Sequence, residues 1–378
     1  MRGCARFSAS TARSHEQGGN AIKAARWFDR EDVRVVNIPE PSAGPGQAVL
    51  RVGLCGICGT DVEEYRHGPV LIPTDQPHPL TGQAAPLTLG HEFWGTVVEV
   101  GPDVTNLSQG DRVAPEVCLA CGSCAYCSSG EPARCRLWAT LGLHANGGLA
   151  EYVAVPAATC IRLPESMEGD EAALVEPTEV AVRAVRSSGL RLGERAVVIG
   201  GGAIGLLVLQ TARAAGARAV YVVEPGPRRR ELARALGAEA AIDPADRAWQ
   251  DELTERCDGL GPDVVLECAG VPGAADTAVA IARKGGRIVL VGIVNEPVPM
   301  RLLEITLGEK HVLGSVQHDS DHDLPAAVNL LATGRVRAGA LVTARIPLDR
   351  VVEDGFEALT PGGDQVKILV GPSGSPPR

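Results

Sequence analysis

The chain has 378 residues, which at roughly 150 residues per domain predicts two domains rather than one. Its net charge is −10, and an acidic protein is a poor ligand for a phosphate backbone. Hydrophobic residues make up 45% and charged residues 22%, the balance of a folded globular protein rather than a disordered one. No apolar run reaches the roughly 18 residues that cross a membrane, and the first twenty residues lack signal-peptide character. We therefore expect a cytoplasmic protein with no nucleic-acid and no membrane partner.

The first part of the chain is predicted to be a polar tail followed by strands. Residues 1–20 are polar and aperiodic, and we expect them to form the tail. Short strand-like runs then alternate with Pro, Gly and Asp turns, which predicts a β-rich, barrel-like domain. These runs are AIKAARWF, VRVVNIPEP, QAVLRVGLCG, EFWGTVVEVG and DRVAPEVC. Among them, residues 67–89 carry five prolines and no periodicity, which predicts a long surface loop.

The pattern changes near Glu168. One helix is expected from there to Gly189, because Ala, Val and Leu recur at helical spacing. Strands and helices then alternate over residues 195–315, which predicts a parallel, doubly wound sheet. The end of the chain, with one helix and the strand VKILVGP, is expected to return to the first domain. The predicted fold is thus α/β, with a discontinuous domain over residues 21–177 and 319–378 and a second domain over residues 178–318.

A glycine motif opens the first helix of the second domain. Gly200, Gly202 and Gly205 form G-x-G-x-x-G directly after the apolar strand AVVIG, the context that a dinucleotide-binding turn requires. Gly200 would allow the tight turn, Gly202 the approach of a pyrophosphate, and Gly205 the close packing of helix and strand. A glycine turn that only packs a helix is the alternative. We also place Ala203, Ile204 and Gly292 among the cofactor-binding residues.

Glu224 ends the second strand, about twenty residues after the glycine motif. A carboxylate there should bind the adenosine ribose hydroxyls and repel a 2′-phosphate, which favours NAD. Arg228, Arg229 and Arg230 follow at once, and an arginine such as Arg229 could accept a phosphate instead. NADP therefore stays open as a second candidate.

Four cysteines, Cys121, Cys124, Cys127 and Cys135, form C-x2-C-x2-C-x7-C. Four thiolates on one short loop can close a tetrahedral zinc site with no open position, so this site would be structural. The odd total of 11 cysteines and their clustering favour a metal over disulfides. Cys118 lies three residues earlier and could compete as a ligand, but we expect it to be spare.

Two further fragments suggest a second, open metal site. They are the segment Cys55-Gly-Ile-Cys58-Gly-Thr-Asp61 and the segment Gly90-His91-Glu92. A thiolate, an imidazole and a carboxylate would supply three ligands and leave a place for water or substrate. Spacing alone leaves two alternatives, because Cys-x-x-Cys could be a redox pair and a lone histidine is more often structural than a ligand.

With these motifs the chain resembles the zinc-dependent medium-chain dehydrogenases of the alcohol and polyol dehydrogenase superfamily, over residues 21–372. The matching motifs are CGICGTD at 55–61, GHE at 90–92, the four-cysteine loop, GGLAEYV at 147–153, LVEP at 174–177 and GGGAIG at 200–205. Within the superfamily it most resembles the (R,R)-2,3-butanediol dehydrogenases and then the sorbitol dehydrogenases, through the loop at 68–93, EITLGEKHVLGS and QVKILV. The resemblance implies a GroES-like, β-barrel-type catalytic domain beside a Rossmann domain, with the active site between them.

The resemblance also implies roles for individual residues. Cys58 matches the catalytic zinc thiolate, His91 the imidazole ligand, and Glu176 the third position, which is glutamate in the polyol and butanediol branch. In that branch Glu92 could ligate directly or in exchange with Glu176. Thr60 matches the hydroxyl that carries the proton from the substrate alcohol to the cofactor ribose, while hydride passes from the carbinol carbon to the nicotinamide.

The chain departs from the family pattern at the proton relay. A histidine usually follows the zinc cysteine by five residues, and Glu63 stands there instead. A carboxylate could finish the relay, or the proton could leave through water with Glu63 a mere surface charge.

Further departures are Trp94, Thr140, Thr178 and Glu179. If these residues line the pocket, the substrate could be a larger polyol, a cyclic alcohol or a biosynthetic intermediate. If they only repack it, the specificity would be unchanged.

The sequence thus predicts an NAD-dependent secondary-alcohol dehydrogenase with one catalytic and one structural zinc ion. The expected partner is a small alcohol or ketone, such as a vicinal diol or polyol, and relatives imply a homodimer or homotetramer. An NADPH-dependent carbonyl reductase is the first alternative, which Glu224 opposes. A nucleotide-binding protein without catalysis is the second, which the complete set of Cys58, His91 and Glu176 opposes. A zinc-ribbon protein that binds nucleic acid is disfavoured by the acidic charge.

Overall fold

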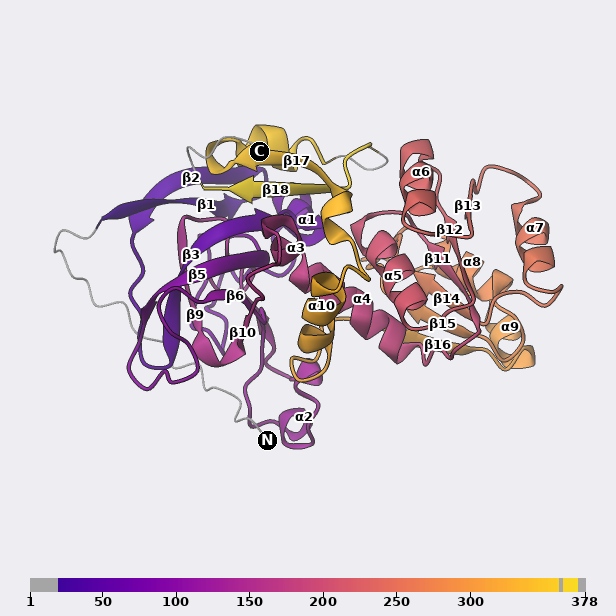
Figure 1. The fold of residues 1–378 in the computed structure, drawn as a ribbon, viewed down its shortest axis with the longest axis horizontal. Coiled ribbons are helices and arrows are strands. Elements are labelled where there is room, and N and C mark those ends of the chain that lie inside the picture. The colour runs from indigo at the N-terminus through magenta and orange to yellow at the C-terminus, as the bar shows by residue number, and fades with distance from the viewer. Residues whose placement is uncertain (1–19, 360–362, 373–378) are drawn as a thin grey trace.

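The computed structural model describes residues 20–359 and 363–372, which form two lobes lying side by side (Figure 1). Residues 1–19 of the expected tail lie outside the described residues. One lobe is built mainly from antiparallel strands and the other from a parallel sheet with helices. Helices α4 (Val175–Ser187) and α10 (Asp323–Ala332) pack against each other between the lobes.

Seven strands of the first lobe form one sheet around β3 (Gln47–Gly56). Its order is β10 (Cys160–Arg162), β6 (Arg112–Pro115), β5 (Glu92–Val100), β3, β18 (Lys367–Gly371) and β17 (Val342–Pro347), and β9 (Tyr152–Pro156) also pairs with β3. Strand β18 comes from the end of the chain, yet it runs antiparallel to β3 with Val370 opposite Cys55. The C-terminal segment therefore completes this sheet.

A smaller antiparallel sheet covers the same core. It consists of β2 (Asp32–Pro39), β1 (Ala21–Asp29) and β4 (Leu87–Thr88). Trp27, Leu50 and Phe356 are fully buried in the core that these elements share. Short elements complete the lobe: α1 (Gly59–His67), β7 (Cys118–Leu119), α2 (Ala125–Ser128), β8 (Ala139–Thr140), α3 (Gly169–Ala173), the 3-10 helices at Pro132–Arg134, Ala157–Thr159, Ala338–Leu341 and Leu348–Arg350, and a π-helical turn at Val351–Phe356.

The second lobe contains the predicted parallel, doubly wound sheet. Its order is β13 (Ala240–Ile242), β12 (Ala219–Val223), β11 (Arg195–Ile199), β14 (Val264–Glu267), β15 (Arg287–Leu290) and β16 (His311–Gly314), with every neighbouring pair parallel. The helices are α5 (Ala203–Ala214), α6 (Pro227–Ala235), α7 (Trp249–Arg256), α8 (Ala274–Ile281) and α9 (Leu302–Leu307). The strand order reverses beside β11, where such sheets bind dinucleotides.

The helix expected from Glu168 to Gly189 is two helices, because α3 ends before Leu174 and α4 begins after it. Pro177 accounts for the break, since a proline has no N–H and its ring excludes the carbonyl of the residue four positions earlier. The break places Glu176 in the first turn of α4, the helix that lies between the two lobes in Figure 1.

The loop at residues 67–89 is not confined to the surface as expected. Ile72, Leu87 and Leu89 are buried in the core of the first lobe. The buried carboxylate of Glu64 anchors the loop, because it accepts backbone N–H bonds from Val70 at 3.0 Å, from Leu71 and from Ile72. The prolines break periodicity, so an apolar pattern gave no sign of this burial.

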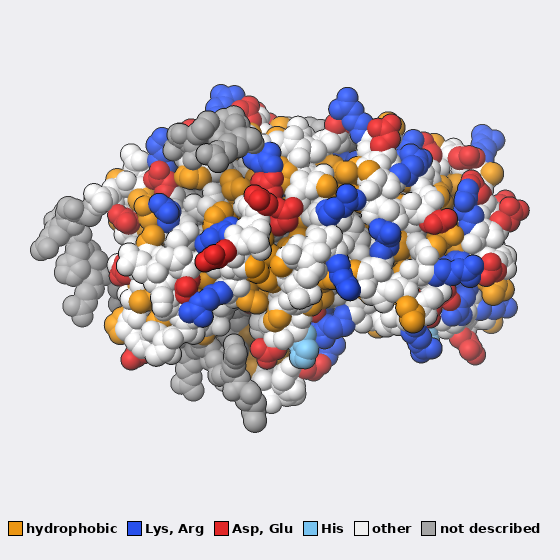
Figure 2. Space-filling model, viewed as in Figure 1, with side chains coloured by type: hydrophobic (Ala, Val, Ile, Leu, Met, Phe, Trp, Pro, Cys, Tyr) orange, Lys and Arg blue, Asp and Glu red, His pale blue; other side chains and the backbone are white. Residues whose placement is uncertain are grey.

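The surface carries charges of both signs. On the face shown in Figure 2, acidic and basic side chains are interspersed rather than gathered in a basic stripe. In the part of the chain that the structure describes, no helix is long and apolar enough to span a bilayer.

Candidate active site and metal centres

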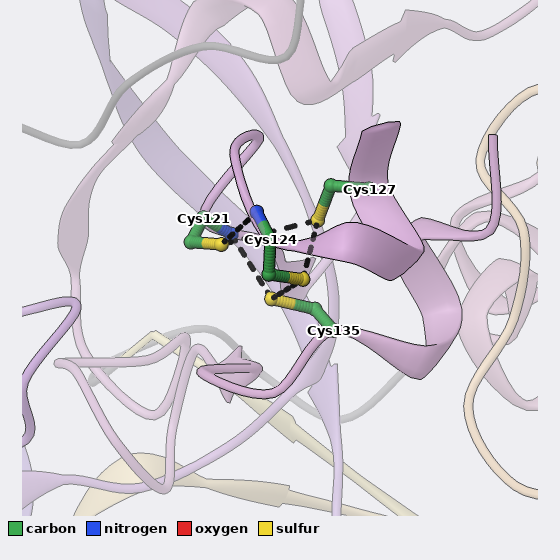
Figure 3. Close-up of side chains that lie close together, drawn as sticks. All are labelled: Cys121, Cys124, Cys127 and Cys135. Atoms are coloured by element: carbon green, nitrogen blue, oxygen red, sulfur yellow. Dashed lines mark hydrogen bonds between the residues drawn. The ribbon is translucent and has the colours of Figure 1, made fainter. Parts of the chain in front are cut away.

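The four cysteines of the predicted structural site converge (Figure 3). The sulfur atoms of Cys121, Cys124, Cys127 and Cys135 all lie within 4.8 Å of one another, and the separation between those of Cys124 and Cys127 is 3.5 Å. These distances are far beyond a disulfide bond and suit four ligands around one ion. Backbone N–H groups of Ser123 and Cys124 lower the pKa of Cys121 to about 6, which favours the thiolate that a metal needs. The loop could therefore hold a structural zinc ion.

A second centre forms where β3, α1 and β5 meet. Ligand atoms of Cys58, His91 and Glu92 lie within 4.8 Å of one another. Cys58 directly precedes α1, and its N–H donates to Asp61 Oδ2 at 2.9 Å. The other Asp61 oxygen lies 3.5 Å from His91 Nδ1, so one buried carboxylate fixes both ligands. Burial disfavours a charged imidazole, but the charges of Asp61 and Cys58 outweigh it and raise the pKa of His91 well above its usual value.

This donor set fits a zinc ion. A thiolate, an imidazole and a carboxylate are the ligand types of an open zinc site. His91 is buried, and its Nδ1 makes no hydrogen bond in the described structure beyond the ion-pair contact with Asp61. Cys55 is buried nearby, but it is not one of the three converging residues.

Glu92 is paired with a lysine that the sequence analysis missed. Lys367 Nζ lies 2.6 Å from Glu92 Oε2 and 2.8 Å from Oε1, and it also donates to the carbonyl oxygen of Ile57 at 3.1 Å. Both side chains of the pair are buried. Lys367 lies in β18, so its apolar context in VKILV suggested only a strand residue.

Glu176 lies beside this centre rather than inside the converging trio. Its Oε1 accepts a hydrogen bond from His318 Nε2 at 3.1 Å. Burial opposes ionisation of Glu176, but the hydrogen bond and charge of His318 and the charges of His91 and Lys367 prevail and lower its pKa. The carboxylate therefore lies within electrostatic reach of the Cys58 centre while it is bound to His318.

The two candidate relay residues share helix α1. Thr60 Oγ1 lies 3.8 Å from Cys58 Sγ. Glu63 is three residues later, and residues at this spacing are neighbours on one helix face. Glu63 Oε1 accepts a hydrogen bond from Asn295 Nδ2 at 3.3 Å, and Asn295 follows β15 in the second lobe. The Glu63–Asn295 contact thus joins the two lobes next to the Cys58 centre.

The four residues that depart from the family pattern fall into two groups. Trp94 packs against Gly53, and its ring centroid lies 4.6 Å from the guanidinium carbon of Arg112. The Thr178 hydroxyl donates a hydrogen bond to the carbonyl oxygen of Leu174 at 2.7 Å. Thr140 instead pairs with Cys118 between β7 and β8, and Glu179 faces His318. Thr140 and Glu179 therefore lie beside Cys118 and His318, two residues near Glu176.

The glycine motif has the geometry that its sequence predicts. Gly200 adopts φ +100°, and a Cβ there would meet the backbone nitrogen of Ala269 at 2.9 Å. A Cβ at Gly205 would collide with the carbonyl oxygen of Gly200, so helix α5 packs directly on the turn. Gly202 is the N-cap of α5, and a Cβ there would have no neighbour within 4 Å. Ala203 and Ile204 belong to the first turn of α5. This open helix N-terminus fits a pyrophosphate.

Glu224 and the three arginines have partners within the protein. The Glu224 carboxylate accepts backbone N–H bonds from Gly201 at 2.6 Å and from Gly226 at 2.7 Å. Arg228 pairs with Asp364, Arg229 donates to the carbonyl oxygens of Gly363 and Gln365, and Arg230 donates to the carbonyl oxygen of Glu224 and pairs with Asp243. Gly292 follows β15, where a Cβ would collide with Gly270.

Comparison with known proteins decides the family. Residues 44–165 match the model of the alcohol dehydrogenase GroES-like domain, and residues 203–333 match that of the zinc-binding dehydrogenases. The (R,R)-butanediol dehydrogenase of Bacillus subtilis is 41% identical over 93% of this chain and 100% of its own length. The chain belongs to the zinc-binding alcohol dehydrogenases.

Other relatives are named for sorbitol and for scyllo-inosose. The sorbitol dehydrogenase of Gallus gallus is 34% identical over 90% of the chain and 93% of the relative. The scyllo-inosose 3-dehydrogenase of Thermotoga maritima is 36% identical over 80% of the chain and 81% of the relative.

Solved structures share the whole fold of the dehydrogenase. The crystal structure of 2R,3R-butanediol dehydrogenase from B. subtilis superposes with a TM-score of 0.87 over 93% of this chain and all of the other. A zinc-binding dehydrogenase from Sinorhizobium meliloti 1021 bound to NADP is 32% identical, with a TM-score of 0.85 over 93% of this chain and all of the other. The expected family and the fold of a GroES-like and a Rossmann domain are therefore confirmed.

Proposed function

We propose that this dehydrogenase oxidises a secondary alcohol of a vicinal diol or polyol to the hydroxyketone with NAD. The observation that carries the proposal is the convergence of Cys58, His91 and Glu92 where β3, α1 and β5 meet. The butanediol and sorbitol dehydrogenases among the relatives support the substrate class. Membership of β17 and β18 in the sheet of the first lobe supports a catalytic domain of residues 21–177 and 319–378 around a Rossmann domain of residues 178–318.

The catalytic zinc ion would be held by Cys58, His91 and Glu92. Glu176, which is hydrogen-bonded to His318, could replace Glu92 as a ligand. When bound, such an ion polarises the alcohol oxygen and lowers its pKa. Thr60 lies next to Cys58 and would accept the alcohol proton through its hydroxyl. Glu63, on the same face of α1, would take that proton onward in place of the usual histidine.

NAD is the better fit to the nucleotide site. Glu224 is held in place by two backbone N–H groups, and its oxygens keep lone pairs for the ribose hydroxyls. A 2′-phosphate there would face this carboxylate. Arg228, Arg229 and Arg230 would each have to give up an existing partner to bind such a phosphate.

The proposal also covers the number of chains in the enzyme and its place in the cell. We place the enzyme in the cytoplasm as a homodimer or homotetramer. The edge strand β16 and the neighbouring helix α9 support assembly, because Leu302, Leu303 and Leu307 are each 70% exposed there. Light scattering would give the number of chains.

The test is NAD and NADP reduction by the zinc-loaded protein with the butanediol stereoisomers, sorbitol and a cyclic polyol. We expect turnover of (R,R)-butanediol with NAD, which a chelator abolishes and zinc restores. Turnover of only the cyclic polyol would move the substrate class towards the inosose relative. A preference for NADP would favour the carbonyl reductase. Bound zinc without turnover of any alcohol would contradict the proposed function.

A further inference from the structure

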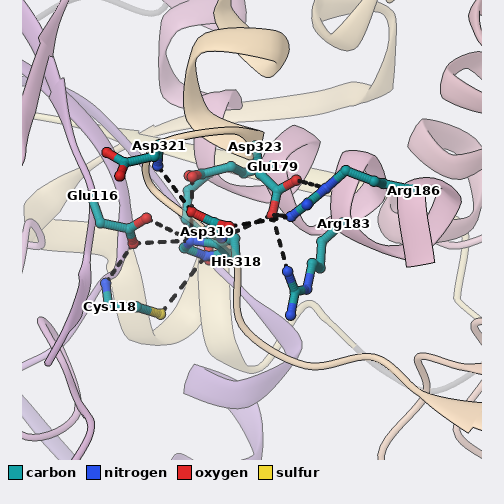
Figure 4. Close-up of polar contacts among 10 residues, drawn as sticks. Glu116, Cys118, Glu179, Arg183, Arg186, His318, Asp319, Asp321 and Asp323 are labelled. Atoms are coloured by element: carbon teal, nitrogen blue, oxygen red, sulfur yellow. Dashed lines mark hydrogen bonds and ion pairs between the residues drawn. The ribbon is translucent and has the colours of Figure 1, made fainter. Parts of the chain in front are cut away.

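His318 is a buried histidine with carboxylates on both sides of its ring. It lies between β16 and α10, and its side chain is 1% exposed. Glu116, between β6 and β7 of the first lobe, faces Nδ1, as Figure 4 shows. Glu176, in the first turn of α4, faces Nε2. The ring therefore bridges the first lobe and a carboxylate that lies beside the catalytic centre.

Both ring nitrogens of His318 donate hydrogen bonds. Nδ1 lies 2.9 Å from Glu116 Oε1 and 3.0 Å from Oε2, and Nε2 lies 3.1 Å from Glu176 Oε1. A nitrogen lone pair would repel a carboxylate at these distances, so each nitrogen carries a proton. Burial opposes a charged ring, but the charges of Glu116 and Glu179 prevail and raise the pKa of His318 well above its usual value.

The place of the His318 ring is set by the next residue in the chain. The N–H of Asp319 donates to Asp323 Oδ2 at 2.8 Å. Asp323 also accepts two hydrogen bonds from Arg186 of α4, at 2.8 Å and 2.9 Å (Figure 4). The backbone beside His318 is thus fastened to the helix that carries Glu176, which fixes where Nε2 meets this carboxylate.

Glu176 is close enough to the catalytic centre to act on it. Burial raises the pKa of Glu92 against the opposing charge of Lys367, and the charge of Glu176 adds to the rise. Glu176 is nevertheless outside the three converging ligands. An open zinc site keeps one position for water or substrate, and a carboxylate is itself a zinc ligand. A Glu176 side chain released from His318 would compete for that position.

We propose that His318 is a positioning residue that holds Glu176 away from the fourth ligand position of the catalytic zinc ion. The inference rests on the proposed function, because it concerns the same zinc site. While Glu176 is bound to Nε2, the three converging residues supply the protein ligands and the fourth position stays open to the alcohol. Without this hydrogen bond the carboxylate would fill the position, and the alcohol would have to displace it.

The two nitrogens of His318 can be replaced separately. The side-chain amide nitrogen of glutamine reaches the place of Nε2, and that of asparagine the place of Nδ1. His318→Gln should therefore keep the bond to Glu176, whereas His318→Asn should keep only the bond to Glu116. His322→Gln is the matched control, because His322 lies on the same loop with a side chain that is 67% exposed.

The first measurement is the zinc affinity of the full-length protein, from metal analysis after dialysis against graded concentrations of a chelator. The ion that Cys58→Ser retains is the ion of the four-cysteine loop. We expect His318→Asn to bind the catalytic ion about tenfold more tightly than the wild type, His318→Gln or His322→Gln. Removing the released carboxylate in His318→Asn/Glu176→Gln should bring the affinity back towards that of the wild type.

The second measurement is steady-state kinetics with (R,R)-2,3-butanediol and NAD. The ligand that tightens zinc binding also blocks the alcohol, so the KM of His318→Asn for the diol should rise by the same factor, about tenfold. Its kcat should change less, because saturating alcohol displaces the carboxylate. His318→Gln should recover most of the KM.

Three results would overturn the proposal. Equal zinc affinity in the wild type and His318→Asn would show that Glu176 is not held back. Weaker zinc binding in His318→Asn would make Glu176 a ligand that His318 keeps in place. Equal rises in KM in His318→Asn and His318→Gln would indicate a purely structural role.

Crystals of the zinc-loaded wild type decide if the variants fail to fold. We expect Glu176 Oε1 to remain hydrogen-bonded to His318 Nε2, and a bond from Glu176 to the catalytic ion would refute the proposal. The affinity measurement does not depend on a substrate. Tighter zinc binding in His318→Asn, together with no turnover of any alcohol by the wild type, would therefore support the positioning role and contradict the proposed function.

Discussion

Lys367 Nζ lies 2.6 Å from Glu92 Oε2, and the pair joins β18 to β5 inside the catalytic lobe. The two residues are 275 positions apart in the sequence, and both are buried. The last strand of the chain therefore supplies the countercharge for a carboxylate of the candidate catalytic centre. This contact couples the C-terminal strand to the candidate metal centre.

Removing Lys367 should destabilise the fold. In the zinc-free protein, Lys367→Met would leave Glu92 buried without a countercharge, and breaking a buried pair in this way costs about 3–5 kcal/mol. The free energy of unfolding in urea measures the loss. The double variant Lys367→Met/Glu92→Gln should recover much of it, because no unpaired charge remains. Equal losses in the single and double variants would show that packing, not charge, explains the effect.

Glu63→Gln should slow the alcohol oxidation and change its pH dependence. A glutamine keeps the contact with Asn295 but cannot accept a proton. We expect kcat to fall at least about a hundredfold at neutral pH, within the range of general acid–base effects. The loss should shrink at high pH, where water removes the proton more readily. Asn295→Ala is the control for the contact alone. An unchanged pH profile of kcat in Glu63→Gln would make Glu63 a surface charge.

Glu224→Ser should change the cofactor preference. The variant loses the ribose hydrogen bonds and the repulsion of a 2′-phosphate, so kcat/KM should fall about 10- to 100-fold with NAD and rise with NADP. Glu224 also holds the N–H groups of Gly201 and Gly226. Equal losses with both cofactors would therefore indicate a damaged turn rather than lost discrimination.

His144 should make the protein less stable in mild acid. Burial lowers the pKa of His144 to about 4, and Nδ1 accepts the N–H of Thr140 at 3.1 Å. A histidine in the unfolded chain titrates at about 6.5, so between these values only the unfolded state binds the proton. Stability should therefore fall as the pH drops from about 6.5 to 4. The unfolding free energy of His144→Gln should depend less steeply on pH in this window.

The exposed His67 provides the control for that experiment. His67→Gln should retain the wild-type slope between pH 6.5 and 4, because replacing an exposed side chain leaves the buried His144 unchanged. The same slope in the wild type and in His144→Gln would mean that other groups cause the acid sensitivity.

Local patterns were enough to predict much of this molecule. The spacing of Cys121, Cys124, Cys127 and Cys135 fixes how far apart their sulfur atoms can lie, and the four do converge. The strand, glycine turn and helix around Gly200 likewise follow from a short stretch of chain. Periodicity also predicted the parallel sheet. Each of these features is determined by residues close together in the sequence.

Contacts between distant segments could not be predicted in this way. His318 sits in the polar stretch QHDSDHD, which is typical of a solvated loop, yet it is buried against Glu116 from the other lobe. Cys118 was expected to be spare, and the structure places it 3.8 Å from His318. Lys367 resembled any strand residue. Only the return of the chain's end to the first lobe brings Lys367 to its partner.

The most direct test of the catalytic assignment compares NADH formation from (R,R)-2,3-butanediol by the wild type and by Cys58→Ser. Metal analysis must first show that the variant keeps the zinc of the four-cysteine loop, so that its fold is intact. We expect one fewer zinc ion in the variant and a rate at least about a hundredfold lower, since the ion that polarises the alcohol is lost. Wild-type turnover in Cys58→Ser would contradict the assignment of the Cys58, His91 and Glu92 centre.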